Sequence, residues 1–183
     1  MKESPLRQSR QFYYLLRKTE RMLATSLTKE LPFFHPVCLI STCCGLGHLP
    51  FAPGTWGSLA ALPLAWLVLT QWGPHILLVI TFVLFLLGML TSAIHVKRTE
   101  DKDPSYIIID EFVGQLLVLS ITPLDWGYFL IAFLLFRIFD IYKPWPISWA
   151  DKEIGSGFGI MLDDILAAGY AAAILYFLLV LMN

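Results

Sequence analysis

The sequence predicts an all-α protein, a multi-span helical membrane bundle with about five spans and a short re-entrant or interfacial segment before them. Its composition favours this class. Hydrophobic residues make up 57% of the 183 residues, compared with about 45–50% in an ordinary soluble domain. Charged residues make up 15%, whereas about 25% is usual. This composition excludes a disordered chain, and the net charge of −1 gives no indication of nucleic-acid binding.

The chain begins with a basic segment, residues 1–35, that differs from the remainder. It contains no continuous apolar run of the kind that a signal peptide needs. Two interpretations stay open: a solvated cytoplasmic tail, or an interfacial helix on an anionic leaflet. Residues 36–183 are expected to form one membrane-embedded domain. Its first apolar stretch, Val37–Leu46, is about half as long as a spanning helix, so we expect a short or re-entrant segment there.

Five longer apolar segments follow, and each is a candidate spanning helix. Tight turns at Gly73-Pro74 and Pro123–Asp125 separate the first span from the second and the third from the fourth. Asp125 directly precedes the fourth segment, so we expect it to be the N-cap. Residues 142–159 form a polar, glycine-containing connector, and the third span is short unless residues 106–109 extend it. The five segments are Trp56–Trp72, Ile76–Ile94, Phe112–Leu124, Trp126–Ile141 and Ile165–Met182.

Basic residues are distributed asymmetrically about these segments. When the spans are numbered alternately, all 13 Lys and Arg residues fall on the side that holds the N-terminal segment. By the positive-inside rule that side is the cytoplasm. The sequence therefore predicts a multi-pass membrane protein with a cytoplasmic N-terminus and with Asn183 on the opposite side. In an alternative model the third and fourth segments form a re-entrant hairpin, which leaves both termini on the same sides.

Acidic residues mark the cytoplasmic ends of the third, fourth and fifth spans. Asp110 and Glu111 begin the third span, Asp140 ends the fourth, and Asp163 and Asp164 begin the fifth. The helix dipole stabilises an acidic residue at a helix N-terminus, so one such pair is most simply a cap. Two pairs together with Asp140 at one face of the bundle favour a functional site, since charges beside membrane spans are costly.

The residue types in this cluster predict a site for a metal and a phosphate. Five neighbouring carboxylates repel one another unless a cation neutralises them, and oxygen ligands favour magnesium, calcium or manganese over zinc. Arg137 and Lys143 indicate a bound anion, for which phosphate is the first candidate. The Pro53–Ser58 turn offers backbone N–H groups and the hydroxyls of Thr55 and Ser58 at the start of the first span.

Four separate motifs, in matching order and spacing, resemble those of the phosphatidylglycerophosphatase A family, from about Pro36 to the C-terminus. The motifs are Ala52–Leu59 (APGTWGSL), Ile109–Gly114 (IDEFVG), Phe136–Pro146 (FRIFDIYKPWP) and Gly159–Asp164 (GIMLDD). The resemblance implies an all-helical, magnesium-dependent lipid phosphatase of the bacterial cytoplasmic (inner) membrane. Such enzymes remove the terminal phosphate of phosphatidylglycerophosphate and give phosphatidylglycerol.

Site residues follow from the resemblance only where the motifs match. It implies that the metal-site residues are Asp110, Glu111, Asp140, Asp163 and Asp164, and that the phosphate-site residues are Thr55, Ser58, Arg137 and Lys143. In the expected chemistry, Mg²⁺ polarises the phosphoryl oxygens. Arg137 and Lys143 neutralise charge in the transition state. One carboxylate, Asp110 or Asp164, takes the proton of the attacking water.

A divalent-cation transporter or channel that uses the same acidic cluster is the alternative function. It predicts charges at mid-span or on both faces of the membrane, but the far side offers only Asp125 and His75. The expected partner is a phospholipid substrate in the bilayer, with no nucleic acid. The histidines that reach the cytoplasmic side, His48 and His95, are expected to be structural. The range of lipid substrates, the number of metal ions and the oligomeric state stay open.

Overall fold

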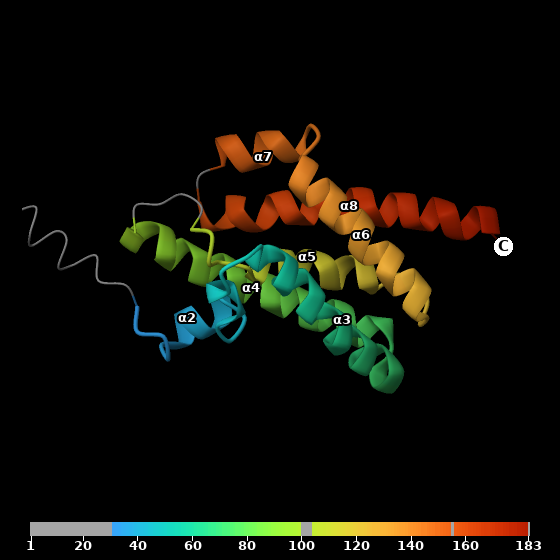
Figure 1. The fold of residues 1–183 in the computed structure, drawn as a ribbon, viewed down its shortest axis with the longest axis horizontal. Coiled ribbons are helices and arrows are strands. Elements are labelled where there is room, and N and C mark those ends of the chain that lie inside the picture. Colours follow the sequence, from blue (N-terminus) through green and yellow to red (C-terminus); the bar gives the residue numbers. More distant parts are fainter. Residues whose placement is uncertain (1–30, 100–103, 155, 183) are drawn as a thin grey trace, which may run out of the picture. The chain divides into compact units, whose positions relative to one another are not determined.

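The computed structural model describes residues 31–99, 104–154 and 156–182, so nearly all of the expected basic tail lies outside the described residues. Within these ranges the chain forms helices and no strand, in agreement with the predicted all-α class (Figure 1). The helical elements are α2 (Pro36–Ser41), η1 (Leu46–His48), α3 (Pro53–Trp72), α4 (Pro74–Thr99), α5 (Ile109–Leu119), α6 (Trp126–Tyr142), α7 (Ile147–Glu153) and α8 (Gly157–Met182).

Five of these helices occupy the positions of the expected spans, but they differ in length. α4 and α8 have 26 residues each and are apolar enough to cross a membrane, since about 39 Å of helix exceeds the roughly 30 Å of a bilayer core. α5 has 11 residues and ends at Leu119 rather than at Leu124. Its length of roughly 16 Å is about half of a bilayer core. The structure thus supports two candidate spanning helices, and a count of five is not confirmed.

α5 is the central helix of the bundle, where it contacts α3, α4, α6 and α8 (Figure 1). Small residues permit this close packing. A Cβ on Gly114 would lie 2.7 Å from the ring of Phe136 and 3.1 Å from the carbonyl oxygen of Asp164. Buried alanines on α8 belong to the same core: Ala167, Ala168 and Ala171. Because protein interiors are close-packed, these contacts fix α5 relative to α6 and α8.

The segment between α6 and α8 differs from the expected connector. It contains a further helix, α7, and α8 begins at Gly157, eight residues before the expected start. A Cβ on Gly157 would lie 2.4 Å from the carbonyl oxygen of Met89, and one on Gly159 would lie 1.6 Å from that of Ile154. These glycines therefore serve close packing of the first turn of α8. Asp163 and Asp164 lie in the second turn, so they do not cap this helix.

Two local predictions are confirmed. Asp125 is the N-cap of α6, and its carboxylate accepts hydrogen bonds from the backbone N–H groups of Gly127 and Tyr128 at 2.8 and 3.3 Å. The apolar stretch after Pro36 forms α2 and η1, which have six and three residues. Elements this short do not cross a bilayer.

Candidate functional site

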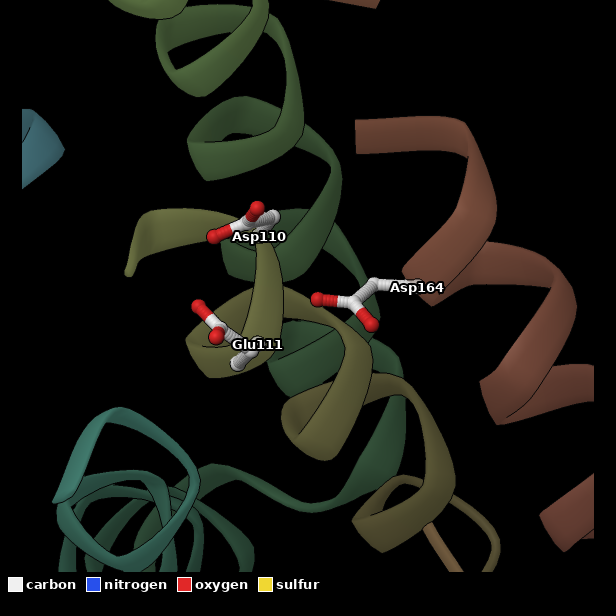
Figure 2. A group of neighbouring side chains, drawn as sticks. All are labelled: Asp110, Glu111 and Asp164. Carbon is white, nitrogen blue, oxygen red and sulfur yellow. The ribbon is translucent and has the colours of Figure 1, made fainter. Parts of the chain in front are cut away.

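The first turn of α5 and the second turn of α8 bring three carboxylates together. Figure 2 shows Asp110 and Glu111 on α5 and Asp164 reaching toward them from α8. One oxygen atom from each of the three side chains lies within 4.8 Å of the others. Asp110 and Asp164 are buried, with 8% and 3% of their surface exposed. The convergence of the acidic pairs that the sequence predicts is therefore observed for these three residues.

Several oxygens of this cluster are buried without a hydrogen-bond partner among the described residues: Asp110 Oδ1, Glu111 Oε2 and Asp164 Oδ1. A buried, unpaired carboxylate is costly, and three together repel one another. A cation bound between them removes both costs, and an oxygen-only set of this size suits a hard divalent ion such as Mg²⁺. The residues present thus fit the metal that the resemblance implies.

A cavity of about 290 Å³ adjoins this cluster. Seven of the nine predicted site residues line it: Asp110, Glu111, Arg137, Asp140, Lys143, Asp163 and Asp164. The other two, Thr55 and Ser58, are not among its lining residues. The Ser58 hydroxyl is buried inside α3, where it donates to the carbonyl oxygen of Gly54 at 3.0 Å. A role for Ser58 in binding phosphate would therefore have to act through a neighbouring residue.

Arg137 is that neighbour, because its Nη1 donates a hydrogen bond to Ser58 Oγ at 3.3 Å. The same nitrogen forms an ion pair with Asp140, three residues further along α6. Its Nε is buried without a hydrogen-bond partner among the described residues. Arg137, which lines the cavity, is thus oriented from two sides, by α3 and by its own helix. This arrangement suits a phosphoryl oxygen as an additional partner.

Lys143 lines the cavity and is held there by two carboxylates. It ends α6 in the left-handed conformation (φ +44°). Its Nζ lies 2.5 Å from Asp151 Oδ1 and 2.6 Å from Asp163 Oδ2. Burial opposes the charge of the ammonium group, but these carboxylates outweigh it and hold the pKa of Lys143 above its ordinary value. Lys143 therefore stays protonated and connects α7 to α8 at the edge of the site.

One residue of the site, Asp151, was not expected from the sequence, and a second, Gly54, has a different role from the expected one. Asp151 lines the cavity from α7, and no signal pointed to it because α7 lies inside the expected connector. Gly54 also lines the cavity, and a Cβ there would lie 1.9 Å from Glu111 Oε1. The sequence predicted that the Pro53–Ser58 turn contributes backbone N–H groups to the site. In the structure its glycine lets α3 approach the carboxylates.

The sequence is similar to proteins of known name over most of its length. The model of the family described as phosphatidylglycerophosphatase A matches residues 39–179. The phosphatidylglycerophosphatase A of Haemophilus influenzae is 43% identical over 152 residues, which are 81% of this chain and 91% of that protein. The protein of the same name from Escherichia coli is 38% identical over 152 residues, covering 81% and 87%. No solved structure matches this chain. The extent of these matches, which include every motif of the site, shows that the chain belongs to the phosphatidylglycerophosphatase A family.

Proposed function

We propose that this chain hydrolyses the terminal phosphomonoester of phosphatidylglycerophosphate, giving phosphatidylglycerol and phosphate, and that it requires Mg²⁺. The observation that carries the proposal is the buried, oxygen-only cluster of Asp110, Glu111 and Asp164 beside the Arg137 guanidinium. The relatives are named for this activity. Neither the family nor the described helices support the alternative of a cation transporter.

Mg²⁺ would be held by Asp110, Glu111 and Asp164, and when bound it supplies charge that polarises the phosphoryl oxygens and lowers the pKa of a nearby water. Asp140 and Ser58 hold Arg137 so that its guanidinium faces the phosphoryl group and neutralises charge in the transition state.

The remaining steps use the chain's own carboxylates. A water oxygen forms a bond to phosphorus while the P–O bond to the glycerol headgroup breaks, and the alkoxide that leaves takes up the proton that the attacking water loses. One carboxylate, Asp110 or Asp164, accepts the proton that the attacking water loses. Asp163 pairs with Lys143 and Asp140 pairs with Arg137. We therefore assign these two carboxylates to holding the two basic side chains in place.

The lipid substrate also accounts for the apolar helices. α4 and α8 are long and apolar enough to keep the protein in a bilayer, so that the tails of a phospholipid can remain in the membrane while its headgroup enters the cavity. We further propose the multi-pass topology of the bacterial inner membrane, with the site and the N-terminus on the cytoplasmic side. The asymmetry of the 13 basic residues supports this orientation.

The test is phosphate release from phosphatidylglycerophosphate in detergent micelles by the purified protein. Release is expected with Mg²⁺, and EDTA is expected to abolish it. Asp164→Asn should lower kcat by about 10²–10³-fold, the range seen when one group that stabilises the transition state is removed. Asp125→Asn is the matched control, because it removes the same charge from the N-cap of α6 and Asn also caps helices. Equal release with Mg²⁺ and with EDTA would refute the metal requirement, and full activity of Asp164→Asn would refute the assignment of the site.

A further inference from the structure

A second buried polar cluster lies beside the first turn of α5 and does not include the carboxylates. Its centre is His95, near the end of α4, which is 4% exposed. The Nε2 atom of His95 lies 2.9 Å from Ser41 Oγ on α2, and its Nδ1 lies 3.4 Å from the hydroxyl of Tyr106. The ring of His48, in η1, stacks on Tyr106 with centroids 5.8 Å apart. His95 therefore joins α2 to the segment that leads into α5.

The same partners hold the backbone at the start of α5. The N–H of Ile108 donates a hydrogen bond to the carbonyl oxygen of Ser41 at 2.9 Å. Ile108 is the N-cap of α5 and stands two residues before Asp110. On the other side of this segment, a Cβ on Gly47 would lie 1.9 Å from the carbonyl oxygen of Tyr106, so η1 packs directly on the backbone. Two contacts thus connect His95 to the start of α5: its ring contacts Ser41 Oγ, and the carbonyl oxygen of Ser41 accepts from the N–H of Ile108.

The start of α5 depends on such contacts because the helix does not cap itself. Ile108 makes no side-chain capping bond, although a capping side chain usually contributes about 1 kcal/mol. A reactive site needs its groups placed within about 0.5 Å, and an error of about 1 Å can cost roughly 100-fold in rate. The placement of Asp110 and Glu111 is therefore sensitive to whatever fixes residues 104–108.

We propose that His95 is a positioning residue, which holds the segment before α5 through Ser41 and Tyr106 and so fixes Asp110 and Glu111 in the site. The proposal rests on the proposed function, because it names the carboxylates that would bind the metal. Imidazole suits this place because a neutral ring donates from one nitrogen and accepts at the other. The Ser41 hydroxyl donates its own proton to the carbonyl oxygen of Cys38 at 3.3 Å, so it accepts from Nε2 in the tautomer whose Nδ1 accepts from the Tyr106 hydroxyl. A Leu side chain at this position makes neither contact.

The test compares His95→Leu, His95→Gln and Thr91→Val in the full-length protein. Thr91 lies one turn before His95 on α4, is 5% exposed, and donates to the Leu87 and Gly88 carbonyl oxygens of its own helix. Thr91→Val is therefore the matched control for loss of a buried polar group. Three quantities are measured: hydrogen exchange of the peptide that covers residues 104–111, the Kd for Mn²⁺ from electron paramagnetic resonance, and kcat for phosphate release.

His95→Leu is expected to speed exchange in residues 104–111 by at least about tenfold and to weaken Mn²⁺ binding by about tenfold, while exchange in α8 stays unchanged. His95→Gln keeps a polar atom near Ser41 and should recover part of both effects. Thr91→Val should change none of the three quantities by more than about twofold. If His95→Leu does not fold, Ser41→Ala replaces it, because this variant removes the hydroxyl but keeps the carbonyl oxygen that binds Ile108.

Exchange in residues 104–111 that matches the Thr91→Val control would overturn the proposal. So would fast exchange in His95→Leu with Mn²⁺ affinity and kcat both unchanged, because the carboxylates would then not depend on this segment. If the wild-type protein binds no Mn²⁺ and releases no phosphate, the proposed function fails instead, and faster exchange in His95→Leu would still support the role of His95 in holding α5.

Discussion

Gly54→Ala would place a methyl group inside the carboxylate site. The new Cβ would lie 1.9 Å from Glu111 Oε1 and 3.3 Å from Arg137 Nη1. Since ordinary van der Waals contact begins at 3.4 Å, the Glu111 oxygen has to move by about 1.5 Å. The carboxylate is the end of a flexible side chain, so it can move without disturbing the backbone of α5.

This geometry predicts that activity and stability respond differently. A displacement of more than about 1 Å in a carboxylate of the proposed metal site is expected to lower kcat by at least about 100-fold, which corresponds to about 2.7 kcal/mol. The free energy of unfolding should change by less than about 1 kcal/mol, because Ala favours the helix by about that amount and offsets part of the rearrangement. The loss of activity therefore exceeds the loss of stability.

The assay is phosphate release from phosphatidylglycerophosphate, with thermal unfolding measured on the same preparations. Gly169→Ala is the control, because a Cβ there has no atom within 4 Å among the described residues. It should leave kcat unchanged and stabilise α8 by roughly 0.5–1 kcal/mol. A Gly54→Ala protein with wild-type kcat would refute the reasoning, since Glu111 would then not be needed where the structure places it.

Three further predictions concern the edges of the site and the topology. Lys143→Met is expected to lower the free energy of unfolding by about 1 kcal/mol, equally at about pH 6 and pH 9 in denaturant titrations. The raised pKa means that the Lys143 contribution is complete below the ordinary value of 10.5 and is lost only above it. Asp125→Ala should destabilise the protein by about 1 kcal/mol through loss of the N-cap, with kcat unchanged in the phosphatase assay. A reporter enzyme fused after Asn183 should be periplasmic, and one inserted at Pro123–Asp125 should be periplasmic only if α5 and α6 each cross the bilayer. A cytoplasmic Asn183 reporter would require an even number of spans.

Local chemistry explains why much of this protein could be predicted from its sequence. Apolar runs and turn residues located α3, α4, α6 and α8, because a helix in an apolar environment must satisfy its own backbone hydrogen bonds. Asp125 was identified as an N-cap from its place before an apolar run. The pairing of Arg137 with Asp140 follows from a spacing of three residues, which puts both on one helix face. The order and spacing of the four motifs predicted the family.

Helix ends and short helices were predicted less well. α8 starts earlier than expected because Gly157 and Gly159 pack against α4 and the end of α7, and a loop-like composition does not distinguish a mobile glycine from a closely packed one. α5 ends at Leu119 although the apolar run continues to Leu124, since apolar composition does not show where a helix stops.

Only the tertiary structure decided which carboxylates converge and which pair with a basic side chain. Five acidic residues were equivalent candidates in the sequence, but Asp110, Glu111 and Asp164 converge, while Asp140 pairs with Arg137 and Asp163 with Lys143. Sequence periodicity gives the face of each helix, but not the rotation or depth of one helix against another. Those are fixed by close contacts between residues far apart in the chain, such as Gly114 against α6 and α8, and such contacts arise only when the whole bundle packs.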